Sequence, residues 1–522
     1  MYLTRLSLTN FRSFGEQTQT IDFGKVTLLF GPNSVGKSTV LLALFYVQEI
    51  LAKGDCNPQY IEALGDKYVG GFKNLVNGKD VNKTIKIELE YEKSDIGRSY
   101  FDVMDLVKTE AVAPPMDDYA ISEVTQMESP AVYASKMAVE FEIAWSQRMK
   151  QAFVKACNIH FDSECIVTIT SDDGLNPTIT GLNYIHPLLI PNSIEELFAY
   201  AIDRDEIHLA VVQAALEDAG KPRTEAEIIQ KLSLQKDKKE DSPGLPDIIE
   251  SAIVSEFHEL ICGDIPPYEY SNPNFKSGIN VNCSMTLLHK PISFRNTEGA
   301  LPPLGVPFES ELVHSNEFRS KVAQEILSDI IVAPLDNLLE ILSRSLSIGP
   351  LRAVPTKESQ PKTIPTQKGW FDGSAGWACL VREQERILPI ISKKLDKGIY
   401  KELSNEIDGA LGANTITKTD IWLSKLGYQL ASEQAVGKQN LLYAQASIMQ
   451  LDEWFSGSLG LYDLHNKVFV QPSDTGVGVS QLLPLIVAAV TIKKGFVAIE
   501  QPELHVHPRV QVDVGDLLTQ IV

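Results

Sequence analysis

The sequence predicts an α/β fold in which the two ends of the chain build one mixed sheet, with a large, mainly α+β insertion between them. Near the amino end, the apolar run Val26–Phe30 enters a glycine-rich turn and then the stretch Lys37–Leu51, which we expect to be a buried helix. From residue 440 onward, strand, glycine turn, helix and strand alternate again, as in an α/β sheet. Between these ends, helical patterns mix with proline-rich loops. We therefore divide the chain into residues 1–95, 96–340 and 341–522.

The other elements follow from local patterns. Alternating apolar and polar residues predict strands at Tyr2–Leu8, Thr18–Phe23 and Thr84–Tyr91. Helical patterns in the insertion cover Ile194–Ile202, Thr224–Leu232 and Glu317–Asn337. The turn-rich stretches expected to be exposed or disordered loops are Gln235–Pro246 and Ala353–Gly369. No sustained heptad pattern appears, which argues against a long coiled coil.

Composition limits the class of protein. The 522 residues are 44% hydrophobic and carry a formal net charge of −21. No stretch approaches the roughly 18 uncharged apolar residues of a membrane span. The chain starts like a strand and not like a signal peptide, so we expect a cytoplasmic protein. Proteins that grip DNA through its phosphates usually carry a basic excess, so this acidity argues against direct DNA binding.

Cysteines and histidines do not indicate a metal site. The six cysteines lack CxxC pairing and are expected to be buried free thiols: Cys56, Cys157, Cys165, Cys262, Cys283 and Cys379. His505 and His507 form an HxH pair, but zinc needs further ligands and none is placed nearby. We expect this pair either to pack structurally or to contact an interface or a phosphate.

A phosphate-binding loop follows the first apolar run. Residues 31–38 fit GxxxxGK[ST], with a predicted strand before them and a predicted helix after them. Backbone amides of such a loop point at the β-phosphate, Lys37 would neutralise the β- and γ-oxygens, and Ser38 would ligate Mg²⁺. ATP is therefore expected on Gly31, Pro32, Asn33, Ser34, Val35, Gly36, Lys37, Ser38 and Thr39.

Near the carboxyl end, a buried strand and a glycine turn add to this chemistry. The strand Gly495–Glu500 ends in a carboxylate that can hold the magnesium shell from the side opposite Ser38. The turn containing Gly476, Gly478 and Ser480 enters the apolar helix Leu482–Ile492. Ser480 suits the N-cap, and the amides behind it form a second anion site. Pro484 removes the normal helical partner of the Ser480 carbonyl, so the first turn is expected to be loose.

These residues resemble the SMC/RecF/OLD clan of ABC-type ATPases. The shared segments are Leu8-Thr9-Asn10-Phe11-Arg12-Ser13-Phe14, the phosphate loop, the glycine turn at 476–481 and Ile499–Pro508. Ile348-Gly349-Pro350-Leu351-Arg352 and Leu64–Val76 further resemble bacterial stand-alone ATPases of anti-phage defence loci, of the Septu- and retron-associated kind. The resemblance covers residues 1–92 and 345–522.

The resemblance implies a homodimer or higher homo-oligomer in which two ATPase heads sandwich two ATP molecules. Gly476, Gly478 and Ser480 would then contact the γ-phosphate held by the partner. Arg12 would lie beside the phosphates of the bound nucleotide.

Two departures from the clan's pattern bear on hydrolysis. Where the clan has a second acid that activates water, this chain has Gln501, which can orient water but is a poor base. The base is therefore either absent, or it is Glu503 beyond the turn, or a natural acid has been replaced by Gln501. The clan also continues past the His-Pro segment with a helix, a strand and a switch histidine. Either the sequence extends beyond Val522 or another segment closes the site.

The leading functional hypothesis is a slow ATPase that acts as a conformational switch. It would control a partner effector, such as a nuclease in anti-phage defence, and would contact DNA or RNA only through that complex. Residues 96–340 would provide a docking surface. The alternative is a RecF- or SMC-type repair ATPase that binds DNA across its head dimer. A transporter subunit fits poorly, and an OLD-type protein with its own nuclease requires a longer chain.

Overall fold

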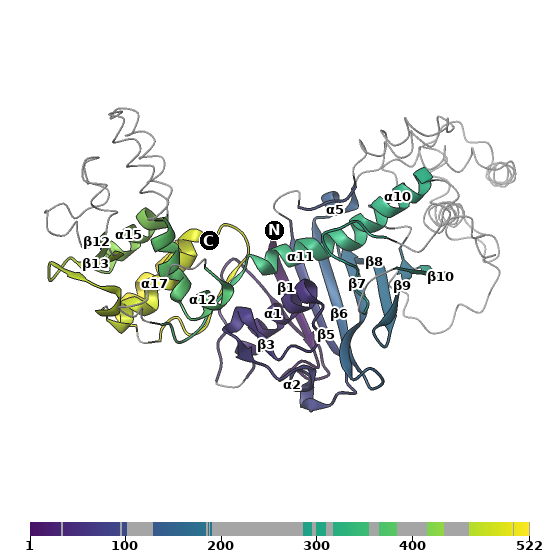
Figure 1. Ribbon diagram of the computed structural model, residues 1–522, viewed down its shortest axis with the longest axis horizontal. Coiled ribbons are helices and arrows are strands. Elements are labelled where there is room, and N and C mark those ends of the chain that lie inside the picture. Colours follow the sequence, from purple (N-terminus) through teal and green to yellow (C-terminus); the bar gives the residue numbers. More distant parts are fainter. Residues whose placement is uncertain are drawn as a thin grey trace, which may run out of the picture. The chain divides into compact units, whose positions relative to one another are not determined.

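The computed structural model describes most of both ends of the chain and part of its middle. The described residues are 1–32, 35–93, 97–101, 129–183, 186, 188–189, 286–294, 299–309, 317–353, 365–383, 415–432, 459–474, 476–504 and 506–520. The chain divides into two compact units, 1–83 with 339–522 and 84–338 (Figure 1). One unit thus joins the two ends of the chain. Of the expected elements, Ile194–Ile202, Thr224–Leu232 and Gln235–Pro246 lie outside the described residues.

The unit of residues 84–338 is built on a large antiparallel sheet. Its strands lie in the order β10-β9-β8-β7-β6-β5, and each is antiparallel to its neighbour. They are β5 (Ile85–Glu92), β6 (Lys136–Ser146), β7 (Gln151–Phe161), β8 (Glu164–Asp172), β9 (Leu175–Leu182) and β10 (Thr286–Ser293). The expected strand at Thr84–Tyr91 is confirmed as β5, and its residues alternate between buried and partly exposed as that prediction requires.

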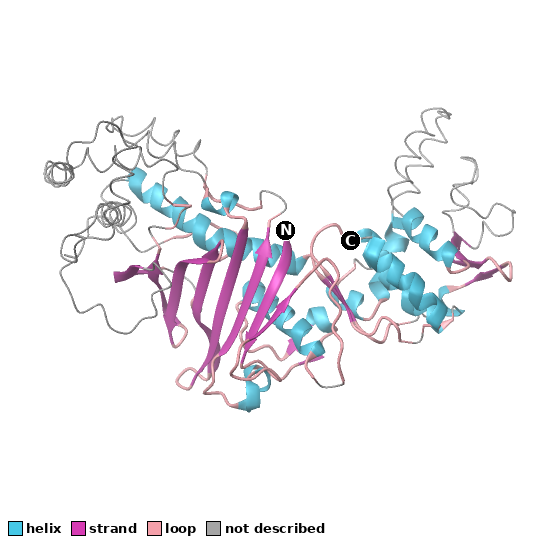
Figure 2. Ribbon diagram, turned by 180° about the vertical axis from the view of Figure 1, so that it is seen from behind, coloured by secondary structure: helices cyan, strands magenta, loops and turns pink. Residues whose placement is uncertain are grey.

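Helices cover one face of this sheet. The expected helix at Glu317–Asn337 is confirmed as α10 (Glu317–Leu327), a π-helical turn (Ser328–Val332) and α11 (Ala333–Ser343). Figures 1 and 2 show α10 and α11 crossing the sheet on one side. The buried hydroxyl of Tyr91 on β5 donates to the Pro334 carbonyl over 2.8 Å, which joins the sheet to α11. A single turn, α5 (Pro130–Tyr133), precedes β6.

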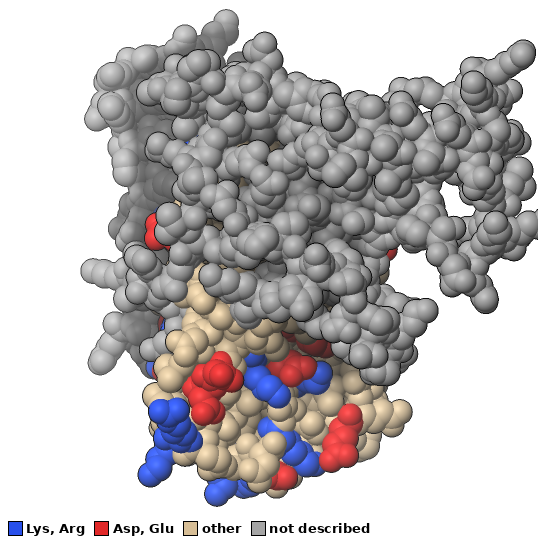
Figure 3. Space-filling model, turned by 90° about the vertical axis from the view of Figure 1, so that its right-hand side faces the viewer, with Lys and Arg blue, Asp and Glu red and all other residues tan. Residues whose placement is uncertain are grey.

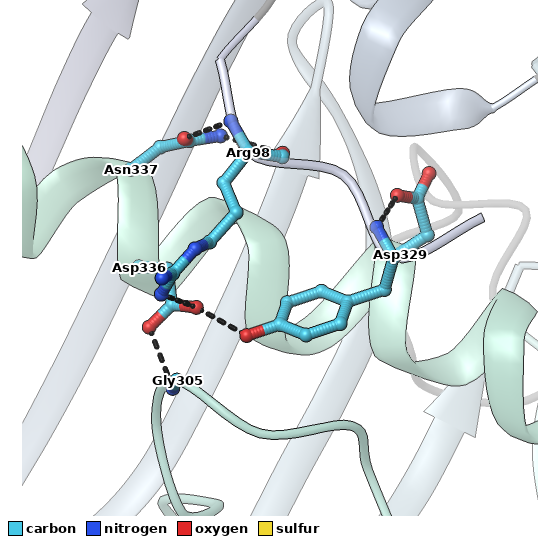
Figure 4. Close-up of polar contacts among 6 residues, drawn as sticks. Arg98, Gly305, Asp329, Asp336 and Asn337 are labelled. Atoms are coloured by element: carbon cyan, nitrogen blue, oxygen red, sulfur yellow. Dashed lines mark hydrogen bonds and ion pairs between the residues drawn. The ribbon is translucent and has the colours of Figure 1, made fainter. Parts of the chain in front are cut away.

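Two buried aspartates, Asp329 in the π-helical turn and Asp336 in α11, hold the loop of residues 97–101 (Figure 4). Asp329 accepts hydrogen bonds from the Ser99 and Ser129 hydroxyls and from the Tyr100 and Ala131 amides. About two turns of helix later, Asp336 accepts from the Arg98 guanidinium, the Tyr100 hydroxyl and the Gly305 amide. Because buried carboxylates need such donors, this network makes the unit's packing depend on residues 97–101.

The unit formed by both chain ends contains several pairs of strands and several helices. β1 (Tyr2–Thr9) pairs antiparallel with β2 (Gln19–Asp22), and β11 (Leu346–Ile348) pairs parallel with β15 (Val497–Ile499). A three-stranded sheet comprises β12 (Tyr428–Ser432), β13 (Leu459–Asp463) and β14 (Val468–Val470). Short pieces are β3 (Tyr60–Ile61), β4 (Lys67–Tyr68) and α2 (Phe72–Leu75). The helices are α1 (Lys37–Lys53), α12 (Gln367–Phe371), α15 (Thr415–Lys425), α17 (Val477–Thr491) and α18 (Pro508–Gln520).

The strand predicted at Val26–Phe30 is wrong. These residues are non-helical and unpaired, and no sheet among the described residues includes them. Their apolar side chains face solvent, with Leu28 66% and Phe30 85% exposed. An apolar run becomes a strand only when another strand pairs with its backbone, and local sequence does not supply that partner. Among the described helices, none is long and apolar enough to cross a membrane.

Candidate nucleotide site

The phosphate-binding loop leads directly into α1. The helix begins at Lys37, and Gly36 forms its N-cap with φ 110° and ψ 5°. The amides of Thr39 and Val40 donate to the Gly36 carbonyl. The Lys37 ammonium donates to the carbonyls of Gly31 and Pro32, over 2.6 and 2.7 Å. The ammonium therefore lies over the loop, where a phosphate bound to the loop amides would meet it. Asn33 and Ser34 lie outside the described residues.

Ser38 and Thr39 differ in exposure. The Ser38 side chain is exposed, whereas Thr39 is buried and its backbone amide helps to start the helix. Ser38 is thus free to meet a metal ion. Thr39 sits in the core and can contribute to a nucleotide site mainly through its backbone.

A second loop packs against Gly36. A Cβ atom at Gly36 would lie 2.7 Å from Ser13 Oγ and 3.5 Å from the Phe14 ring. The contact with Ser13 is too short unless that side chain shifts, and the positive φ of this N-cap also disfavours residues other than glycine. The Asn10–Gly15 loop therefore lies beside the phosphate-binding loop, with Arg12 one residue from the contact.

Arg12 is held in an uncommon backbone conformation. Its φ is 50°, in the left-handed region that non-glycine residues rarely adopt. The Arg12 amide donates to the Leu75 carbonyl, and the Asn77 side-chain amide donates to the Arg12 carbonyl, both over 2.7 Å. The Asn77 backbone amide donates to Asn10. Burial lowers the pKa of the Arg12 guanidinium. Residues 75–77 thus hold the backbone of a half-buried arginine in the loop that lies next to the phosphate-binding loop.

The acidic end of the site follows β15. The Glu500 amide donates to the Ile348 carbonyl over 2.9 Å, which continues the parallel pairing of β15 with β11. Glu500 is partly exposed, and Gln501 is exposed with φ 48°. Glu503 and His507 are also exposed, while His505 lies outside the described residues. The chain therefore turns sharply just after the strand and presents its polar side chains to solvent.

The two ends of the chain meet at the Phe371 ring of α12. A Cβ atom at Gly65 would lie 2.4 Å from this ring, and one at Gly349 would lie 2.8 Å from it. Gly349 also donates its amide to the Phe371 carbonyl. Farther along α1, the Phe45 ring lies 6.0 Å from the Phe496 ring, just before β15. These contacts connect the phosphate-binding loop's helix and the strand that ends in Glu500 within one unit.

The glycine turn forms the start of α17. The prediction that Ser480 is the N-cap is wrong, because the helix begins at Val477 with Gly476 as N-cap. Ser480 lies inside the first turn, is fully buried and donates its amide to the Gly476 carbonyl. Its hydroxyl has no hydrogen-bond partner among the described residues. Gly476 is exposed, with no heavy atom within 4 Å of a Cβ built there, and Gly478 is partly exposed. The accessible groups at this end are therefore backbone groups.

Comparison with known proteins identifies the family. A model of the AAA ATPase domain matches residues 1–262 of the 522-residue chain. The chain belongs to the AAA ATPase domain family. The ATPase class and the α/β fold predicted from the sequence are confirmed.

Relatives of this ATPase include a DNA-repair protein. A stretch of 79 residues is 40% identical to DNA replication and repair protein RecF of Roseiflexus castenholzii, covering 15% of this chain and 20% of that protein. The chain thus matches only a minor part of that relative. The Smc head domain with an extended coiled coil bound to the C-terminal domain of ScpA, from Pyrococcus furiosus, is 12% identical at a TM-score of 0.30; the match covers 100% of this chain and 87% of that one. The Smc head domain with a coiled coil and joint from Pyrococcus yayanosii is 13% identical at a TM-score of 0.30, covering 100% and 90%.

Two residues that were expected at a Mg²⁺ site carry oxygen donors. Ser38 supplies a hydroxyl and Glu500 a carboxylate, the donor types that this ion prefers alongside nucleotide phosphates. Among the described residues, no group of three or more His, Cys, Asp and Glu could hold a metal without such a ligand. Cys56, Cys157 and Cys165 are buried free thiols, as expected, and Cys379 is partly exposed; Cys262 and Cys283 lie outside the described residues.

Sequence reasoning missed the residues that hold the site together. Asn77 follows a segment that the resemblance pointed out, and Gln481 ends another, but neither received a role. Arg352 ended a third such segment and also received no role. Each acts through contacts with residues far away in the sequence, which only the fold reveals.

Proposed function

We propose that this ATPase is a conformational switch that closes as a homodimer around two ATP molecules. Each chain would bind one ATP on Gly31–Thr39 and offer the N-terminus of α17 to the ATP of its partner. The observation that carries this proposal is the exposed, unobstructed Gly476 at the start of α17, on a chain that has one such turn and one phosphate-binding loop. Helix N-termini attract phosphate through their amides and dipole.

The chemistry within each site would be divided among a few residues. Lys37 and Arg12 would neutralise phosphate charge, and Ser38 and Glu500 would hold Mg²⁺, which when bound polarises the phosphates. Because the Ser480 hydroxyl is buried, the backbone of Gly476–Gly478 would make the contacts with the partner's ATP. Gln501 would orient water without removing its proton, so hydrolysis would be slow and the closed dimer long-lived.

The partner would be an effector protein, such as a nuclease in anti-phage defence, docked on the unit of residues 84–338. Support comes from the resemblance of Ile348–Arg352 and Leu64–Val76 to defence ATPases. DNA or RNA would be contacted only through the complex. On the described part of the face drawn in Figure 3, acidic and basic side chains are interspersed and form no continuous basic stripe.

The second candidate is a repair ATPase that holds DNA across its head dimer. The 40% identity to RecF over 79 residues favours it. The net charge of −21 opposes it, because non-specific DNA binding depends on phosphate neutralisation. Binding of a bare duplex oligonucleotide by the isolated protein at ~150 mM salt separates the two, since only the repair ATPase should bind tightly there.

A mixing experiment tests the dimer. Lys37→Ala disables the phosphate-binding loop, and Gly478→Asp places a negative charge at the start of α17. Each variant alone should be inactive. A mixture should regain ATP-dependent dimerisation and part of the activity, because a mixed dimer has one intact site, made by the loop of one chain and the helix of the other. If the mixture stays inactive, and the wild type remains monomeric by light scattering with ATP and Mg²⁺, the proposal fails.

A further inference from the structure

Arg352 lies buried between α17 and the end of β15. Arg352 is only 3% exposed. Nη1 donates to the Gln481 carbonyl over 3.2 Å, and Nη2 donates to the Glu500 carbonyl over 3.1 Å. One guanidinium group therefore joins the first turns of α17 to Glu500, the residue that follows β15.

The backbone strengthens the same connection. The Gln481 side chain accepts from the Arg352 amide over 3.2 Å and donates to the Arg352 carbonyl over 2.7 Å. Gln481 is 4% exposed, so these bonds are shielded from water. Because paired, buried hydrogen bonds are short-range and directional, a shift of Gln481 must move Arg352 or break them.

The charge of Arg352 is poorly compensated for a buried group. Its hydrogen-bond acceptors are neutral carbonyls, its Nε has no partner among the described residues, and it makes no ion pair there. Burial lowers the pKa of this guanidinium to about 10, while the nearby Glu503 carboxylate opposes the shift. A cation in such surroundings costs stability that an apolar side chain of similar size would not cost. A role in packing alone would not explain it.

Arg352 lies in closely packed surroundings, next to a part of α17 that lacks one helical hydrogen bond. A Cβ at Gly373 would lie 2.9 Å from Arg352 Cβ, so Arg352 packs closely against Gly373, and one at Gly376 would lie 2.9 Å from the Pro484 backbone, so α17 packs closely against Gly376. Pro484 lies inside α17 and has no N–H for the Ser480 carbonyl. The first turn of the helix can therefore tilt on the rest, and Gln481 lies at the joint.

We propose that Arg352 is a positioning residue that transmits the seating of α17 on the partner's ATP to the Glu500 end of β15. This inference rests on the proposed dimer. When the first turn of α17 engages the partner's phosphate, Gln481 shifts, and Arg352 carries that shift to the Glu500 backbone. The Glu500 carboxylate and Gln501 then take the positions that hydrolysis needs. Seating of its helix would accelerate each chain's hydrolysis of its own ATP, and a chain whose helix is not seated would hydrolyse slowly.

Variants at Arg352 separate this role from nucleotide binding. In Arg352→Met, the Kd for ATP should stay within about threefold of wild type and ATP should still produce the dimer, while the single-turnover hydrolysis rate falls by at least about tenfold. Arg352→Lys keeps the charge but not the two-pronged donor, so it should recover only part of the rate. Arg344→Met is the matched control, because Arg344 lies on the surface in an ion pair with Glu340, and it should leave the rate unchanged.

Gln481→Met provides a second route if Arg352→Met does not fold. It removes both side-chain bonds to the Arg352 backbone and keeps side-chain volume. Because both residues act on one connection, Arg352→Lys should lower the rate less in the Gln481→Met background than in wild type. Additive losses, an unchanged rate in both single variants, or a loss of ATP binding that matches the loss of rate would each overturn the inference. The proposed function would survive any of these results if the Lys37→Ala and Gly478→Asp variants complement each other and ATP drives dimerisation. If ATP produces no dimer, the proposed function and this inference both fail.

Discussion

The side-chain amide of Asn77 donates to the carbonyl of Arg12 over 2.7 Å, across 65 positions of sequence. Together with the bond from the Asn77 amide to Asn10, it holds the Arg12 loop against the phosphate-binding loop. This contact shows what the end of the segment Leu64–Val76 does in the structure. Leu75 and Asn77, the residue after the segment, form a clamp that keeps Arg12 in a left-handed conformation beside the phosphate-binding loop.

The first prediction tests the Asn77 clamp. Asn77→Ala should weaken ATP binding up to about fivefold, because loss of one hydrogen bond of about 1 kcal/mol lets Arg12 leave its conformation. Titration with a fluorescent ATP analogue measures this effect. Asn82→Ala is the matched control, since Asn82 is exposed and its side chain donates to the neighbouring Asp80. In the Arg12→Ala background, Asn77→Ala should have no further effect on affinity. An equal loss in both backgrounds would show that Asn77 does not act through Arg12.

The second prediction concerns Gly36. Gly36→Ala should destabilise the protein by about 1–3 kcal/mol, because it combines a positive φ with a Cβ that meets Ser13, and it should abolish ATP binding. Gly78→Ala separates the two causes. Gly78 has φ 67°, but a Cβ there would have no neighbour within 4 Å, so only the backbone strain of about 1 kcal/mol should appear. Denaturant titration of both variants checks the difference; equal losses would mean that the Ser13 contact is relieved at no cost.

The success of sequence reasoning varied with the origin of each signal. The phosphate-binding loop and the helix after it were predicted because their evidence is contiguous, running from Gly31 into the apolar stretch of α1. The strand at Val26–Phe30 was wrong because strand formation depends on a partner that local sequence does not name. The N-cap at Ser480 was wrong because the helix extends back through Gly478, despite glycine's cost of about 1 kcal/mol in helices. Packing of α17 outweighs that preference.

The antiparallel sheet of residues 136–182 was missed although a signal was present. Asp173 and Gly174 have φ 51° and 81° and join β8 to β9, and an Asp-Gly pair between alternating segments is a strong hairpin indicator. Arg352 could not have been assigned in this way. Its partners in the structure include Gln481, 129 positions away, and no local pattern connects them.

The third prediction is a pH dependence at Asp420. This carboxyl group is buried on α15 and accepts from the Leu430 amide over 2.6 Å; burial raises its pKa from 3.8 to about 6. Because the folded state binds the proton more tightly than the unfolded chain, stability falls as pH rises from about 4 to 6 and stays lowered above that. Asp420→Asn removes the charge, so it should stabilise the protein by up to about 3 kcal/mol at pH 7.5. The gain should vanish below about pH 4. Thermal unfolding at several pH values measures it, and a gain that does not change with pH would contradict the assignment.

The last prediction concerns Gln501, whose backbone offers a test that sequence alone could not suggest. Gln501 is exposed and has φ 48°, so the residue after the acidic strand is held in a conformation that costs about 1 kcal/mol or more for any residue but glycine. Strain of this kind at an exposed position points to a function for the side chain. Gln501→Gly should therefore raise the melting temperature while lowering the single-turnover hydrolysis rate, because the strain is relieved and the group that orients water is lost. Gln501→Glu keeps the strain but supplies a base, so it should accelerate hydrolysis and shorten the lifetime of the dimer.

Glu503→Gln tests the rival assignment, in which Glu503 is the base. If Glu503 is the base, its loss should abolish the residual activity and Gln501→Glu should add little. If none of the three variants changes the single-turnover rate, the attacking water is held elsewhere and the turn after Glu500 is only structural.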